Sequence, residues 1–115
     1  MVFDRDGNLV LVTGTPGGGR IINVVLQIIV NMIDYGMNVA AATQAPRFNQ
    51  SWRTNALALE SGINNDTARI LQSWGHEITR NRTMGSTQSI AIHDGYFAGA
   101  ADTRRPGALA IGPQL

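Results

Sequence analysis

The stretch from Ile21 to Ile33 constrains the fold more than any other part of the sequence. It is apolar except at Asn23, Gln27 and Asn31. These polar residues are four apart, so on a helix they form one narrow stripe and leave most of the circumference apolar. A helix of this kind is normally covered on more than one side. We therefore predict a helix over about 20–35, ended by Gly36, that belongs to a larger structure than a small domain.

A glycine-rich turn leads into this helix from an apolar segment. Residues 9–12 read Leu-Val-Leu-Val, which favours a central strand covered on both faces. The turn follows at residues 14–19, which read Gly-Thr-Pro-Gly-Gly-Gly. Consecutive glycines let the backbone approach a ligand and point successive N–H groups at it, and the helix N-terminus adds a positive partial charge. The turn can therefore hold an anion, either a phosphate or the oxyanion of acyl transfer.

The residues of the turn leave three interpretations open. Gly14 to Gly19 has the G-x-x-x-x-G frame of a phosphate loop, but Arg20 and Ile21 replace the lysine and the Mg²⁺-binding hydroxyl that should follow. An oxyanion hole would use the N–H groups of Gly17 and Gly18. A tight turn that merely joins strand to helix is the reading that the residues alone favour. Besides an enzyme, two other functions stay open. One is a non-catalytic anion- or nucleotide-binding module that uses this turn, and the other is a gene remnant that acts only by association.

The remaining elements follow from periodicity and from turn residues. We expect a hairpin around Asp6-Gly7, a helix over 38–44 capped by Asn38, and a polar irregular segment over 47–55. A strand over 56–60, a helix from Asn64 or Asn65 to about 74, and an extended segment over 76–79 should follow. A second hairpin of 86–92 and 96–100 around Asp94-Gly95 and an irregular tail over 103–115 should end the chain.

Composition excludes several classes of site and partner. The 115 residues carry a net charge of +1, which gives no reason to expect nucleic acid or an anionic membrane as a partner. There is no cysteine and there are only two histidines, so we predict no metal site. We also predict no cofactor. The longest apolar stretch is too short to span a bilayer.

We interpret His93 as a turn residue, and Arg47 and Arg104 as buried ion-pair partners. We interpret three aromatic residues as packing or interface residues: Phe48, Trp52 and Trp74.

Several ordered motifs resemble one known family. Residues 13–22 read Thr-Gly-Thr-Pro-Gly-Gly-Gly-Arg-Ile-Ile, and 31–36 read Asn-Met-Ile-Asp-Tyr-Gly. Downstream come Ala45-Pro46-Arg47-Phe48, the run Met-Gly-Ser-Thr-Gln-Ser-Ile at 84–90, and Gly-Ala-Ala-Asp at 99–102 with Arg104. Together, from about residue 3 to residue 105, the chain resembles the gamma-glutamyltransferase (gamma-glutamyltranspeptidase) family.

This resemblance implies a fold and a reaction. The family belongs to the N-terminal nucleophile hydrolases, so the resemblance implies an α+β chain that forms part of a four-layer αββα sandwich with mostly antiparallel strands.

Members of the family cut a precursor into a large and a small subunit. The threonine freed at the start of the small subunit attacks the gamma-glutamyl bond of glutathione or a related donor, and water or an amino acid or peptide resolves the acyl-enzyme. Gly17 and Gly18 match the Pro-Gly-Gly turn whose backbone amides form the oxyanion hole.

The resemblance also implies that residues 1–115 are an incomplete domain, the C-terminal portion of the small subunit. The segment with the nucleophilic threonine is not among them, and neither Thr13 nor Thr15 can replace it. Two motifs depart from the family: Asp102-Thr103-Arg104 stands where Asp-Pro-Arg is usual, and Asn49-Gln50 stands where histidine is frequent. We therefore expect the chain alone to be inactive and to expose an apolar patch. Its expected partners are the large subunit and the rest of the small subunit, or a second copy in their absence, and the family suggests a periplasmic or secreted location.

Overall fold

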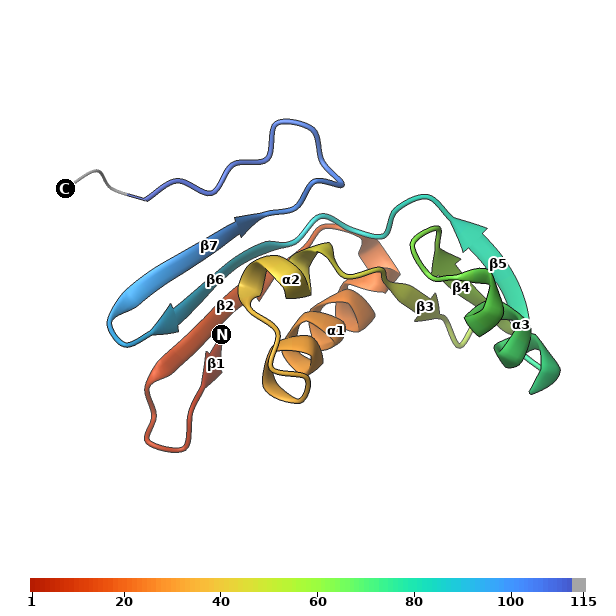
Figure 1. The fold of residues 1–115 in the computed structure, drawn as a ribbon, viewed down its shortest axis with the longest axis horizontal. Coiled ribbons are helices and arrows are strands. Elements are labelled where there is room, and N and C mark those ends of the chain that lie inside the picture. The colour runs from red at the N-terminus through yellow and green to blue at the C-terminus, as the bar shows by residue number, and fades with distance from the viewer. Residues whose placement is uncertain (113–115) are drawn as a thin grey trace.

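The computed structural model describes residues 1–112 as an elongated α+β molecule of 51 × 34 × 26 Å with two separate sheets (Figure 1). The four-stranded sheet has the order β1 (Val2–Phe3), β2 (Leu9–Gly14), β6 (Gln88–His93), β7 (Tyr96–Ala101). The three-stranded sheet has the order β3 (Phe48–Gln50), β4 (Ala56–Glu60), β5 (Glu77–Asn81). Among the described strand pairs, β4–β5 alone is parallel. The predicted α+β class with mostly antiparallel strands is confirmed.

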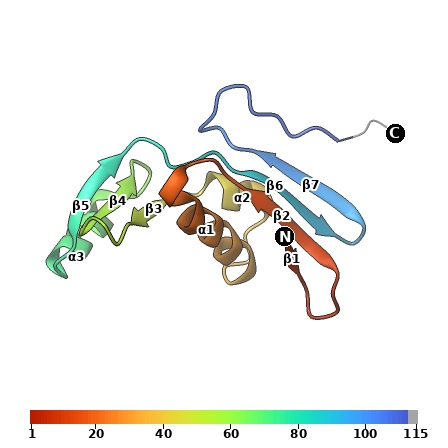
Figure 2. The same ribbon diagram turned by 180° about the vertical axis from the view of Figure 1, so that it is seen from behind.

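The four-stranded sheet carries helices on one face. The helices α1 (Ile21–Ile33) and α2 (Val39–Gln44) lie on one side of it, and residues 103–112 run along the other side, as Figures 1 and 2 show from front and back. On the helical face of β2, Leu11 is 2% exposed, whereas its neighbour Val12 on the opposite face is 37% exposed. The prediction that β2 is an inner strand is confirmed. The prediction that both its faces are covered is wrong for residues 1–112, because the tail leaves an open pocket of about 530 Å³ over Val12, Ile90 and Phe97.

The predicted long helix is shorter in the structure and is preceded by a separate turn. The three residues η1 (Gly18–Arg20) form a 3₁₀ turn, and α1 begins only at Ile21. At the other end, Gly36 has φ +65° and the N–H of Met37 donates to the Asn31 carbonyl at 2.9 Å, which closes the helix after Ile33. Val24 and Ile28 are buried, but Ile22 is 78% exposed, so residues 1–112 do not cover the apolar circumference fully.

The three-stranded sheet packs against α3 (Asn65–Ser73). Leu57 and Leu59 of β4 form a buried cluster with Ala68 of the helix. Asn64 caps α3 by accepting the N–H of Thr67 at 2.7 Å, as predicted, and β4 spans the predicted strand. The expectation of an irregular segment over 47–55 is wrong at Phe48–Gln50, which forms β3. This short strand has no pattern of its own and forms because β4 offers it an edge.

The two hairpins differ from one another. The first was expected to turn tightly at Asp6-Gly7, but Phe3 pairs with Leu9 and residues 4–8 form the connection. The Asp4 carboxylate holds that wider loop by accepting the N–H groups of Asp6 and Asn8 at 2.9 and 2.8 Å. The second hairpin is the predicted two-residue turn, with φ +49° at Asp94 and +78° at Gly95.

Two further expectations concern the tail and the membrane. Residues 103–112 contain no helix or strand, as predicted, and residues 113–115 of the predicted tail lie outside the described residues. The longest described helix, α1, has 13 residues, and nowhere in residues 1–112 is a helix long and apolar enough to cross a bilayer.

Candidate functional site

The glycine-rich turn lies where β2 passes into η1 and α1. Gly17 has φ +145° and Gly18 has φ +57°, conformations that L side chains rarely adopt. Both glycines are exposed. Within residues 1–112, the N–H groups of Gly17 and Gly18 donate no hydrogen bond. The turn therefore presents two adjacent unused donors at the start of a helical segment.

A second segment, residues 84–87, supports this turn from behind. The Ser86 N–H donates to Thr15 Oγ1 at 2.9 Å, and Thr15 Oγ1 donates to the Pro16 carbonyl at 2.8 Å. Gly85 has φ +69°, and a Cβ atom at this position would collide with Thr15 Oγ1 and come within 3.2 Å of the Pro16 oxygen. Glycine at this position therefore leaves room for the Thr15 hydroxyl, and its positive φ also favours glycine.

The geometry next to the turn does not favour a phosphate loop. With the Asn81 amide oxygen facing Arg20, the guanidinium Nη2 and Nη1 donate to it at 2.9 and 3.2 Å. The Arg20 side chain is thus directed to the end of β5. Ile21 offers no oxygen at the position where a hydroxyl would bind Mg²⁺.

A buried cluster of four charged side chains lies behind residues 84–87. It consists of Arg47, Glu60, Asp102 and Arg104. Arg47 Nη2 donates to Asp102 Oδ2 at 2.7 Å, and Arg104 Nη2 donates to Glu60 Oε2 at 2.6 Å. Arg104 Nη1 also reaches Asp102 Oδ1 at 3.2 Å. The predicted role of Arg47 and Arg104 in buried ion pairs is confirmed.

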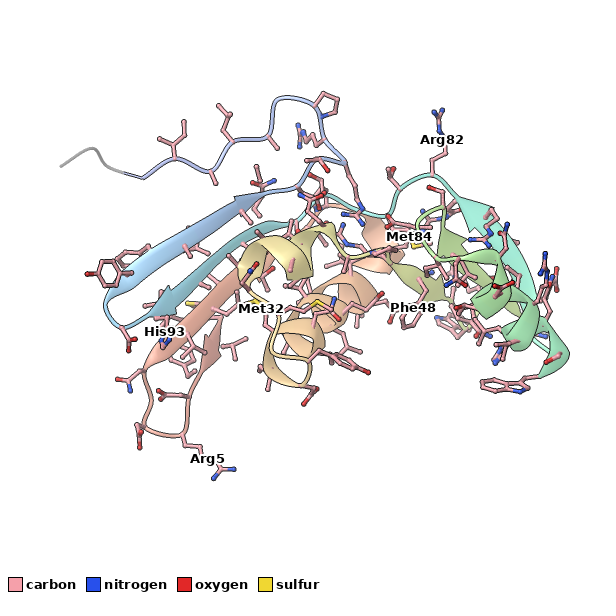
Figure 3. The ribbon with its side chains drawn as sticks, viewed as in Figure 1. Arg5, Met32, Phe48, Arg82, Met84 and His93 are labelled. Carbon is pink, nitrogen blue, oxygen red and sulfur yellow. The ribbon has the colours of Figure 1, made fainter. Side chains whose placement is uncertain are left out.

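The cluster fixes the backbone of residues 84–87. The Met84 N–H donates to Glu60 Oε1 at 2.6 Å, and the Met84 carbonyl accepts from Arg47 Nη1 at 2.7 Å. The Thr87 N–H donates to Asp102 Oδ2 at 2.7 Å. Figure 3 shows Met84 in the middle of the molecule, where its side chain packs with Val24. The charge cluster and the glycine-rich turn are therefore connected through one short segment.

Both carboxylates of the cluster have depressed pKa values. Burial raises the pKa of Glu60, but hydrogen bonds from Arg104 and from the Arg47 and Met84 N–H groups outweigh it and hold the pKa below its usual value. Burial likewise raises the pKa of Asp102, and the hydrogen bonds from the Arg104 and Thr87 N–H groups and from Arg47 outweigh it. Both groups are therefore charged at neutral pH.

These depressed pKa values predict acid lability. A carboxyl with a lower pKa in the folded state contributes stability that is complete above its unfolded pKa, about 4 for Asp and Glu, and is lost as pH falls through the folded pKa. We expect the urea midpoint of the chain to be constant from pH 7 to about 5.5 and to fall steadily below pH 5. Asp102→Asn should make this decrease shallower without abolishing it, because Glu60 keeps its lowered pKa. Asp66→Asn, which removes an exposed ion pair with Arg69, should leave it unchanged, and equal slopes for the two variants would contradict the assignment.

Sequence reasoning missed the carboxylate partners of the two arginines. Glu60 ends an apolar strand and resembles an ordinary strand terminus, yet its side chain is 4% exposed. A lone acid that closes the run Ala-Leu-Ala-Leu was the available signal. His93 lies at the tip of the β6–β7 hairpin, as predicted (Figure 3). Trp52 and Trp74 are 91% and 73% exposed, so residues 1–112 do not pack them.

This architecture matches that of known proteins. The family model of gamma-glutamyltranspeptidase matches residues 1–112. The glutathione hydrolase proenzyme of Escherichia coli strain K12 is 49% identical over 109 residues, which are 94% of this chain and 19% of the relative. A gamma-glutamyltranspeptidase inhibited by acivicin superposes with a TM-score of 0.86 at 36% identity, over 92% of this chain and 59% of that one. A mutant of the Helicobacter pylori gamma-glutamyltranspeptidase gives 0.84 at 38%, over 90% and 58%.

The chain spans about a fifth of the length of the curated relatives that it matches. The match nevertheless covers the described residues from the first strand to the tail, including the glycine-rich turn and the charge cluster. The chain therefore belongs to the gamma-glutamyltranspeptidase family.

Proposed function

We propose that residues 1–115 act as the C-terminal portion of the small subunit of a gamma-glutamyl hydrolase and transferase. In this role the chain supplies the oxyanion hole through the N–H groups of Gly17 and Gly18. The observation that carries the proposal is the pair of unused N–H donors on two exposed glycines at the start of a helical segment. Because residues 1–112 match the model of an enzyme family, we propose that these donors act in the reaction of that family.

The proposed chemistry is that of acyl transfer through a threonine, which membership of the family supports. A threonine nucleophile attacks the carbonyl carbon of a gamma-glutamyl amide, and the carbonyl oxygen becomes an oxyanion. Two N–H groups directed at that oxygen stabilise it more in the transition state than in the substrate. The tetrahedral intermediate then collapses to an ester and expels the amine, which takes up a proton. Water or an amino acid attacks the ester and releases the threonine. Glutathione, named in the curated relatives, is the donor that we propose.

The nucleophile and the groups that bind the donor are not among these residues, so the chain needs partners. We propose that the large subunit and the rest of the small subunit pack on the open face of the four-stranded sheet. This face carries Val12 and Ile90 at 37% and 45% exposure. Leu109 and Ile111 of the tail add to the same apolar surface. Uncovered apolar area of this kind favours association.

The isolated chain is expected to self-associate through this face. We expect sedimentation equilibrium to show concentration-dependent association. The double substitution Val12→Thr/Ile90→Thr should raise the apparent dissociation constant at least about tenfold, because it removes apolar area from the contact. Ile70→Thr is the matched control, because Ile70 is comparably exposed on α3, away from this sheet. An equal effect of the control and the double substitution would contradict the proposal.

The activity is tested in a complete enzyme. Residues 1–112 would replace the matching segment of the E. coli glutathione hydrolase proenzyme, and hydrolysis of a chromogenic gamma-glutamyl amide would be measured. We expect turnover by this graft and none by the 115-residue chain alone. Turnover by the isolated chain, or a folded and processed graft without activity, would overturn the proposal. Tight Mg²⁺-dependent binding of ATP by the chain, measured by calorimetry, would instead support the nucleotide-binding alternative.

A further inference from the structure

The hydroxyl of Thr15, a residue of the glycine-rich turn itself, makes two hydrogen bonds. It accepts the N–H of Ser86 at 2.9 Å and donates to the carbonyl of Pro16 at 2.8 Å. Thr15 is half-buried, and both bonds are made with backbone atoms of this chain. Its hydroxyl thus connects the turn to the segment 84–87.

The second of these bonds acts on one particular peptide plane. The Pro16 carbonyl and the Gly17 N–H belong to the same trans peptide group, so they point in opposite directions and rotate together. Gly17 has no side chain to restrict that rotation, and its φ of +145° lies in a region that glycine occupies freely. Holding the Pro16 oxygen therefore sets the direction of the Gly17 N–H.

The other side of the Thr15 hydroxyl is held by rigid structure. Gly85 lies against Thr15 so closely that a Cβ atom there would displace the hydroxyl. The backbone on either side of Gly85 is bound to the buried charges, since the Met84 N–H donates to Glu60 and the Thr87 N–H donates to Asp102. The hydroxyl is therefore held by a segment whose backbone is bound to the buried charge cluster.

We propose that Thr15 is a positioning residue for the oxyanion hole, and that its hydroxyl aims the Gly17 N–H by holding the Pro16 carbonyl. Thr15 touches no reacting atom; it acts through the Pro16–Gly17 peptide. The proposal rests on the proposed role of Gly17 as an oxyanion donor. The positions of Gly17 and Gly18 alone do not indicate this role of Thr15.

The kinetic test compares three substitutions in the active graft. Thr15→Val keeps the shape of the side chain and removes the hydroxyl, whereas Thr15→Ser keeps the hydroxyl. Thr13→Val is the matched control, because the half-buried Thr13 hydroxyl bonds Ser89 Oγ at 2.7 Å on the neighbouring strand rather than Pro16 or residues 84–87. We expect Thr15→Val to lower kcat about 10- to 100-fold with KM within about twofold, since a misplaced donor weakens transition-state binding. Thr15→Ser and Thr13→Val should stay within about threefold of the parent.

An orientation measurement does not depend on activity. In the ¹⁵N-labelled 115-residue chain, the residual dipolar coupling of the Gly17 N–H reports the direction of that bond relative to α1. We expect Thr15→Val to change this coupling while those of Val24 and Ile28 stay the same. Thr15→Ser and Thr13→Val should preserve all three couplings.

The outcomes separate the two proposals. If Thr15→Val leaves both kcat and the Gly17 coupling unchanged, the positioning role is wrong, whatever the oxyanion hole does. If the coupling changes but kcat does not, the hydroxyl aims the N–H as stated and Gly17 is not the oxyanion donor, which overturns the proposed function at this residue. If Thr13→Val matches Thr15→Val in both measurements, the effect is general to lost hydroxyls and the inference fails.

Discussion

Replacing Asp102 with alanine is expected to lower the free energy of unfolding by about 3–5 kcal/mol. The carboxylate is fully buried and accepts hydrogen bonds from Arg47, Arg104 and Thr87. Its removal leaves Arg47 buried without its countercharge and leaves the Thr87 N–H without an acceptor, and both losses are costly in a dry interior. A loss of this size is a large share of the stability of a typical domain.

The measurement is urea unfolding at pH 7, followed by circular dichroism. Asp66→Ala is the control, because it removes an aspartate from an exposed ion pair with Arg69 and should cost less than about 1 kcal/mol. Asp102→Asn should fall between the two, since it keeps an acceptor oxygen but leaves the two arginines facing only Glu60. If the free energy of unfolding of Asp102→Ala lies within about 1 kcal/mol of that of the parent, the buried charge cluster does not stabilise the fold as proposed.

Gly17→Ala is expected to lower kcat of the active graft by about 10²–10³-fold, because Gly17 is the oxyanion donor that we propose and losing one such donor usually has this effect. A Cβ atom at Gly17 would meet only ordinary contacts, at 3.8 Å from the Arg20 Cβ and 3.9 Å from the Gly85 Cα. The penalty therefore comes from the backbone, because a φ of +145° is strained for alanine and relaxing it turns the N–H away.

Gly19→Ala is the matched control for this substitution. Gly19 belongs to the same turn, its φ is ordinary, and an added Cβ would have nothing within 4 Å. We expect its kcat to stay within about threefold of the parent, because neither the backbone nor a neighbour has to move. Equal losses for Gly17→Ala and Gly19→Ala, measured with a chromogenic gamma-glutamyl amide, would show that the turn tolerates no side chain anywhere and would remove the support for a specific donor.

Local patterns predicted most of the secondary structure because each depends on neighbouring residues. Asn38 and Asn64 cap their helices as expected, and Asp94-Gly95 makes its tight turn. The same reasoning failed at β3, whose pairing comes from β4, and at the first hairpin, where the Asp4 carboxylate holds a wider loop than Asp6-Gly7 suggests. Both failures depend on partners that periodicity does not encode.

The site was predictable only in part for a similar reason. Glycine spacing showed that the turn can hold an anion, although the residues alone favoured a plain connecting turn, and the ordered motifs indicated the family. The contacts of Thr15 with Ser86 and of Arg47 with Asp102 join residues far apart in sequence. Neither pair has a spacing that a helix or a strand would reveal, so these contacts required the structure.

The two sheets also differ in how their strands are distributed along the chain. The three-stranded sheet and α3 come from residues 48–81 alone, whereas β2 pairs with β6, which begins only at Gln88. During synthesis the local unit can close early, while the apolar strand β2 must wait for most of the chain to emerge. Until then its edge and its apolar side chains stay open to other nascent chains. We therefore expect β2, rather than the local unit of residues 48–81, to be the segment of this polypeptide most open to aggregation during synthesis.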